Sequence, residues 1–134
     1  MRLIFAVEPH GWGQLRLVDS HESQVTIDLR VSYLSDVLTK IVSAFADVAD
    51  GAESAEAGMG LEPGDAWLRI QRRGETWSTI ELQIEDPGVV VSTSSFRVPT
   101  RGLAQIAVEM AASVDRETYL REWSPTATWP RESD

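Results

Sequence analysis

The chain has no cysteine and only two histidines, which limits the chemistry open to it. Without cysteine there are no disulfides, thiol nucleophiles or Cys-based zinc sites. The composition is compatible with the reducing environment of the cytosol. His10 and His21 lie in adjacent connecting segments, and a metal site needs three or four ligands. With Glu8 or Glu22 they would form only a weak surface site. We therefore expect no metal and no cofactor.

Long apolar runs are also missing. The segment LIFAV meets Glu8 and Pro9 at once, and the longest apolar-rich segment, VLTKIVSAFADVA, is interrupted by Lys40 and Asp47. Neither a signal peptide nor a membrane-spanning helix is expected from these patterns. The default expectation is a soluble cytoplasmic protein.

Positive charge is scarce. Twelve basic residues, of which only Lys40 is lysine, stand against 21 acidic ones, and the net charge is −9. Such a chain repels phosphate backbones and anionic membrane surfaces, so neither nucleic acid nor membrane is an expected partner. Six acids lie between Lys40 and Arg69 without a base among them. This stretch is either a solvated loop or a patch for a basic partner; its acids are Asp47, Asp50, Glu53, Glu56, Glu62 and Asp65.

Catalytic motifs are absent as well. No G-x-S-x-G elbow presents a serine, and STSS (92–95) is typical of a polar strand. GMGLEPG lacks the lysine and glycine spacing of a phosphate loop. In EPHGWG (8–13), Gly11 and Gly13 can supply positive φ angles for a tight turn, and Trp12 resembles Trp67 in EPGDAW as a packing residue. No catalytic residues are predicted, and the chain is not expected to be an enzyme.

Hydrophobic alternation predicts three strands at 2–8, 13–19 and 23–31, joined by short connectors into an antiparallel meander. A helix follows, with Ser32 as N-cap and Gly51 as its stop. The apolar stripe of this helix consists of Leu34, Val37, Leu38, Ile41, Phe45 and Val48.

After the helix, 51–65 has no periodicity and is interpreted as an exposed acidic linker. The pattern then repeats, with strands at 66–72, 76–85 and 88–98. A second helix from about Thr100 has an apolar stripe made of Leu103, Ile106, Ala107, Met110 and Val114. A short third helix carries Tyr119, Leu120 and Trp123 and ends before Pro125, and Trp123 and Trp129 are expected to pack back on the body.

These elements predict one α+β domain over 1–134. Its mostly antiparallel six-stranded sheet is in βββα-βββα order, with two main helices on one face and a short C-terminal helix. Segments 1–50 and 66–115 form a pseudo-repeat that is either coincidence or an old duplication. The face opposite the helices would be solvated or would recognise a protein, and its residues are Gln24, Thr26, Asp28, Arg30, Trp67, Arg69, Gln71, Thr79, Glu81 and Gln83.

The segment EPGDAWLRIQRRGETWSTIELQI and the tail YLREWSPTATWP resemble the small single-domain immunity proteins of bacteria and related uncharacterised families. The resemblance covers most of the chain through motifs of low specificity. It implies a toxin inhibitor that acts by binding a cognate protein and has no catalytic residues.

The leading hypothesis is therefore a bacterial, cytoplasmic, non-catalytic module that binds a basic protein. The residues predicted to contact the partner are Asp28, Asp50, Glu53, Glu56, Glu62, Asp65, Trp67, Arg69 and Glu81. A second class is a structural or assembly adaptor in which the sheet face or a strand edge pairs with a copy of itself, giving a homo-dimer. A third is a small enzyme or ligand-binding domain with a pocket between sheet and tail.

Overall fold

Three strands at the N-terminus form an antiparallel sheet in the computed structural model. They are β1 (Arg2–Glu8), β2 (Trp12–Asp19) and β3 (Gln24–Ser32), in the order β1-β2-β3. The predicted meander is confirmed. The structure describes residues 1–8, 12–19, 24–32, 36–61, 64–86, 89–123 and 129.

Helix α1 (Val37–Ala49) begins later than the sequence indicated. Ser32 is the buried last residue of β3, so its assignment as N-cap is wrong; Asp36 occupies the N-cap position. The helix stops as predicted, because Gly51 adopts φ +124°, which favours glycine. Its predicted apolar stripe is buried from Val37 onward, and Leu34 lies outside the described residues.

A second sheet has four antiparallel strands: β4 (Ser54–Gly60), β5 (Asp65–Arg72), β6 (Trp77–Asp86) and β7 (Val89–Pro99). The prediction of one six-stranded sheet in βββα-βββα order is therefore wrong, because the chain forms two separate sheets and seven described strands.

The missed strand is β4, which lies inside the segment interpreted as a linker. Its composition of alanine, glycine and glutamate disfavours a strand, but its backbone pairs with β5 from Ser54 opposite Gln71 to Gly60 opposite Asp65. These ladder hydrogen bonds offset the weak local preference.

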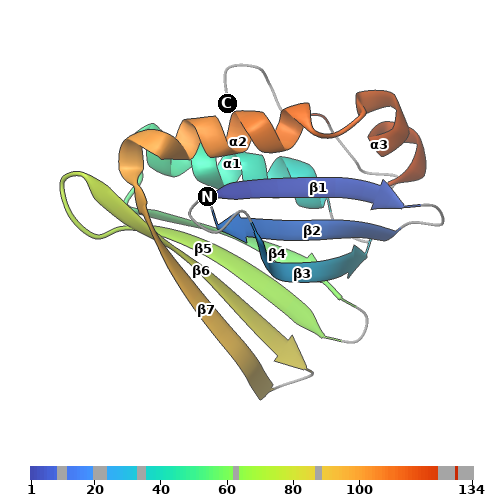
Figure 1. Cartoon of the computed structure of the whole chain (residues 1–134), viewed down its shortest axis with the longest axis horizontal. Coiled ribbons are helices and arrows are strands. Elements are labelled where there is room, and N and C mark those ends of the chain that lie inside the picture. The colour runs from blue at the N-terminus through green and yellow to red at the C-terminus, as the bar shows by residue number, and fades with distance from the viewer. Residues whose placement is uncertain are drawn as a thin grey trace.

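The helices lie against both sheets (Figure 1). The short 3₁₀ turn η1 (Thr100–Gly102) leads into α2 (Leu103–Ala112), and α3 (Arg116–Glu122) follows. Helix α1 contacts β4 and β5, whereas α2 contacts α1 and β1, and the sheets approach each other where β3 contacts β4. No helix in the described part of the chain is long and apolar enough to cross a membrane.

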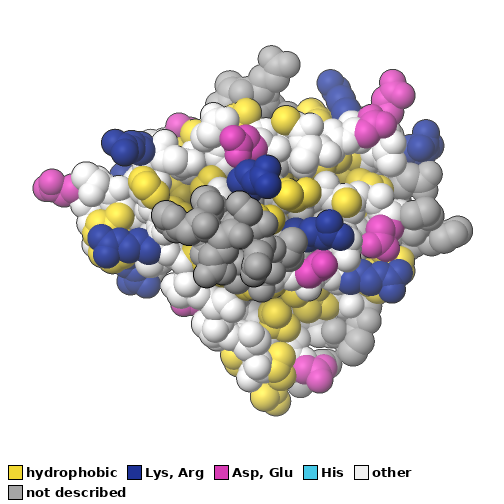
Figure 2. Space-filling model, in the orientation of Figure 1, with side chains coloured by type: hydrophobic (Ala, Val, Ile, Leu, Met, Phe, Trp, Pro, Cys, Tyr) yellow, Lys and Arg dark blue, Asp and Glu magenta, His cyan; other side chains and the backbone are white. Residues whose placement is uncertain are grey.

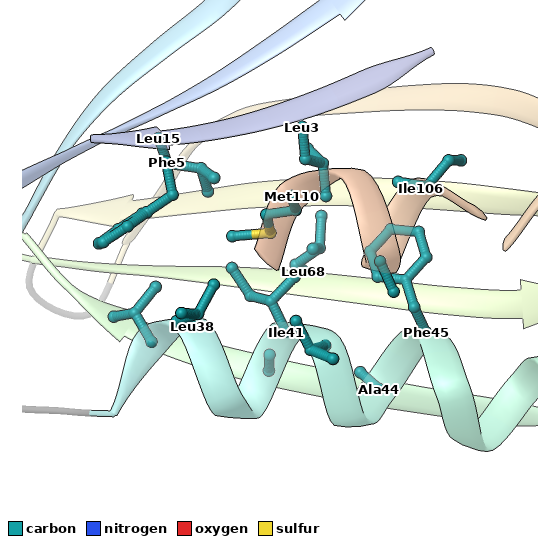
Figure 3. Packing of buried hydrophobic residues seen from close by; sticks show 14 of the residues in the cluster. Leu3, Phe5, Leu15, Leu38, Ile41, Ala44, Phe45, Leu68, Ile106 and Met110 are labelled. Carbon is teal, nitrogen blue, oxygen red and sulfur yellow. The ribbon is translucent and has the colours of Figure 1, made fainter. Parts of the chain in front are cut away.

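One hydrophobic core joins these elements. Leu3 and Phe5 point from β1 toward Met110 of α2, while Ile41 of α1 and Leu68 of β5 close the core from the other side (Figure 3). The predicted stripe of the second helix is buried, so its side chains contribute to the same core. Burial of such side chains is the main stabilising term in a domain of this size.

The C-terminal aromatic residues pack back on the body, as predicted. Tyr119 of α3 and Trp123, the residue that follows this helix, stack with ring centroids 5.5 Å apart, and both meet Phe5 edge to face. Gly13 admits this packing, because a Cβ there would lie 2.8 Å from both Phe5 Cζ and Trp123 Cη2. The described glycines with positive φ are Gly51 and Gly64, so the prediction of a positive φ at Gly13 is wrong.

Candidate functional site

The side of the four-stranded sheet that faces away from the core, here called the outer face, carries several of the predicted contact residues. In β5 the buried side chains Ala66, Leu68 and Ile70 alternate with side chains on the outer face. Strand pairing continues this alternation across β4, β6 and β7. The outer face includes Glu56, Gly58, Asp65, Trp67, Arg69, Glu81, Gln83, Glu85 and Val90.

Arg69 lies between two of the predicted acids. It is opposite Glu56 on β4 and Glu81 on β6, and its guanidinium approaches their carboxylates to 3.0 and 3.5 Å. The structure thus brings these three residues together, but they neutralise one another. Exposed ion pairs of this kind contribute about 0 to 1 kcal/mol each.

Trp67 lies over a gap left by glycine. It is opposite Gly58 on β4, where a Cβ would approach the indole ring to 3.0 Å. The ring remains 37% exposed, with Gln83 opposite it on the other side. Trp67 therefore packs along one side, as the sequence suggested, and presents apolar surface to solvent on the outer face.

Asp65 and Glu85 form a like-charge cross-strand pair beside Trp67. They are direct partners in the β5–β6 ladder, and neither has an ion-pair partner among the described residues. Gln83 donates a hydrogen bond to Glu85 at 2.8 Å. Like charges placed directly opposite each other are destabilising, so this arrangement costs stability.

Two further side chains border the acidic pair. Val90 of β7 is opposite Glu85 and is 53% exposed. Lys40 of α1 lines a hollow of about 270 Å³ together with Asp65 and Trp67, without an ion pair to either carboxylate. Sequence reasoning missed the placement of Glu85 and Val90, because only the strand register shows that they adjoin Asp65.

Asp28 lies on the other sheet and does not join the outer face. Its carboxylate is 3.6 Å from the Arg16 guanidinium and accepts a long hydrogen bond from Gln14. Nearby, Arg30 stacks 4.3 Å above the Trp12 ring. Basic and acidic side chains accordingly lie next to one another on this side of the molecule (Figure 2). The side chains of Gln24 and Thr26 fall outside the described ones.

Two other predicted acids, Asp50 and Glu53, are exposed at a corner between α1 and β4. Glu62 lies outside the described residues. Arg72 links β5 to the end of α1 at this corner. Its guanidinium donates hydrogen bonds to the carbonyl oxygens of Val48 at 2.5 Å and Ala52 at 3.2 Å. A cation that binds the last carbonyls of a helix offsets their partial negative charge.

The end of the sheet far from the Asp65–Glu85 pair carries two arginines near its β7 edge. The guanidinium of Arg97 on β7 lies 4.1 Å above the Trp77 ring, and both residues line a hollow of about 780 Å³ with Glu75 and Arg101. Arg97 and Arg101 have no ion-pair partner within the described ranges. No sequence motif predicted this cluster, although the two arginines are only four positions apart.

Among the residues that the structure describes, no group of three His, Cys, Asp or Glu side chains could hold a metal ion. Comparison with protein-family models, with curated proteins and with solved structures found no match to this chain.

Proposed function

We propose that the chain is a non-catalytic protein-binding module whose outer face receives a basic segment of another protein. The contact centres on Asp65, Trp67 and Glu85. Glu56, Arg69 and Glu81, which already satisfy one another, form the border of the contact.

The observation that carries this proposal is the like-charge pair Asp65 and Glu85 without a base to bridge it. An arginine or lysine head group placed between the two carboxylates would remove their repulsion and form charge-assisted hydrogen bonds. The same cation could stack on the exposed ring of Trp67, and its alkyl stem could pack on Val90. Tryptophan and arginine are enriched among the residues that dominate binding energy in protein interfaces.

The finer form of the proposal is a bacterial, cytoplasmic immunity protein that inhibits a toxin by direct binding. The absence of cysteine, the net charge of −9 and the resemblance of the β5–β6 region and the tail to immunity proteins support it. The same charge argues against nucleic acid and membrane as partners. No enzymatic activity is proposed.

Site-specific photocrosslinking tests the location of the contact. A photoreactive amino acid replaces Gln83, at the centre of the outer face, and in a matched control it replaces Gln14, on the three-stranded sheet. In cells that contain the natural partner, the Gln83 position is expected to capture a protein with a basic surface segment and the Gln14 position is not. Capture of the same protein at Gln14 alone would place the contact on the wrong sheet and overturn the proposal.

A further inference from the structure

Strand β7 is an edge of the four-stranded sheet without a charged residue along most of its length. It pairs only with β6 in the described structure, so one side of its backbone is unpaired. The segment 89–96 reads VVVSTSSF, and the first charge after it is Arg97. Natural proteins usually protect such edges with charges, prolines or a covering element. The free edge of β7 therefore has the properties of a surface that pairs with another strand.

The beginning of β7 also exposes apolar side chains. Val89, Val90 and Val91 are 63%, 53% and 59% exposed. The end of the β6–β7 hairpin projects away from the helices in Figure 1, and hydrophobic side chains gather at the corresponding tip in Figure 2. A register shift next to Glu85 marks a β-bulge near these valines. Three consecutive exposed valines are unusual on a solvated edge strand and are typical of a surface that another chain covers.

The two ends of β7 carry opposite charges, and this polarity indicates the occupant. Asp86, the last residue of β6, pairs with Val89 at the beginning of β7, whereas Arg97 and Arg101 lie at its end. In an antiparallel pairing of two β7 strands, the end of each sheet that carries Asp65, Glu85 and Asp86 lies on the same side of the dimer as the Arg97 end of the other sheet. A parallel pairing would place like charges together. The neutral segment between the ends avoids the repulsion expected between two chains of net charge −9.

We propose that a second copy of this chain covers the free edge of β7, with the two β7 strands antiparallel across a two-fold axis. The two four-stranded sheets then join into one eight-stranded sheet. A two-fold interface repeats each contact, so a single complementary strand is sufficient on both sides. The proposal does not depend on the protein-binding outer face, because edge pairing leaves Asp65 and Trp67 exposed.

Sedimentation velocity of the full chain over a concentration series tests the oligomeric state. A dimer is expected, and V91K should raise its dissociation constant about tenfold or more, because each copy would bring a lysine into an uncharged interface. V108K is the matched control: Val108 lies on α2 and is 54% exposed, similar to Val91. A wild-type chain that stays monomeric, or a dimer that is weakened by V108K and not by V91K, would overturn the proposal.

Charge reversal at the strand ends tests the antiparallel arrangement with variants at other positions. D86R alone and R97E alone each place like charges at facing ends of the two sheets in a homodimer, so each is expected to dimerise more weakly than the wild type at low ionic strength. Mixed together, the two variants restore opposite charges at both pairs of facing ends and should form a heterodimer. If each variant alone dimerises as the wild type does, or if a folded mixture, checked by circular dichroism, forms no heterodimer, the antiparallel β7 interface is wrong.

Discussion

Asp65 and Glu85 lie directly opposite each other on β5 and β6, and the described residues supply neither with an ion-pair partner. Because these like charges repel each other, D65N should raise the free energy of unfolding by about 0.2 to 1 kcal/mol at low ionic strength. The gain should shrink as salt screens the pair. Urea denaturation measures both effects. E81Q, which removes an ion pair with Arg69, serves as a control and should not stabilise the fold; a destabilised D65N would contradict the described repulsion.

Gly13 is a second test, because its backbone lies against two aromatic rings. In G13A the new methyl group would lie 2.8 Å from Phe5 and Trp123, and overpacking of this kind costs about 1 to 3 kcal/mol. Gly60 offers a matched control in β4, since the nearest atom to a Cβ there is 3.8 Å away. Denaturation curves should separate the two variants clearly. Equal stabilities would show that the tail does not pack as described.

Tyr119 ties the C-terminal helix to the beginning of α1. Its hydroxyl donates a hydrogen bond to the Asp36 carboxylate and accepts one from the Leu38 amide at 3.3 Å. Because a buried hydrogen bond to a charged acceptor contributes about 1.5 to 3 kcal/mol, Y119F should lower the free energy of unfolding by that amount. Thermal or urea unfolding measures the loss, and an unchanged stability would mean that the hydroxyl is not anchored to Asp36.

Burial, followed by the hydrogen bond to Asp36 and its negative charge, raises the pKa of the Tyr119 hydroxyl well above its ordinary value. The folded chain therefore keeps its proton when the unfolded chain loses it, and stability falls as pH rises above about 10. Below that pH the contribution is complete. We expect the stability difference between wild type and Y119F to decrease by at most about 1.4 kcal/mol per pH unit above pH 10. A difference that stays constant from neutral to alkaline pH would contradict this shift.

Local patterns in the sequence were sufficient for most elements. The alternation in 2–8 and 13–19 predicted strands that match β1 and β2 closely, because each has one buried face. In α1 the stripe formed by Val37, Leu38 and Ile41 defined the buried side. These elements are predictable because each buries one face, and the spacing of its apolar residues in the sequence shows which face that is.

The missed strand and the separate sheets depend on contacts between distant segments. In β4, Ala55, Ala57 and Met59 face the core and alternate with polar or small residues, but alanine is a weak signal for a buried strand. Pairing with β5 makes this segment a strand. The neutralisation of Glu56 by Arg69 likewise depends on register, which no local pattern specifies.

The most direct test of the proposed binding face uses the partner that crosslinking identifies, purified on its own. Isothermal titration calorimetry measures its affinity for the wild type and for the double variant D65N/E85Q. At low salt the double variant is expected to bind at least about tenfold more weakly, a loss of about 1.4 kcal/mol, and the gap should narrow as salt is added. D28N, on the other sheet, should bind as the wild type does. Equal affinity of wild type and D65N/E85Q at low salt would contradict the account, because the acidic pair beside Trp67 would then take no part in recognition.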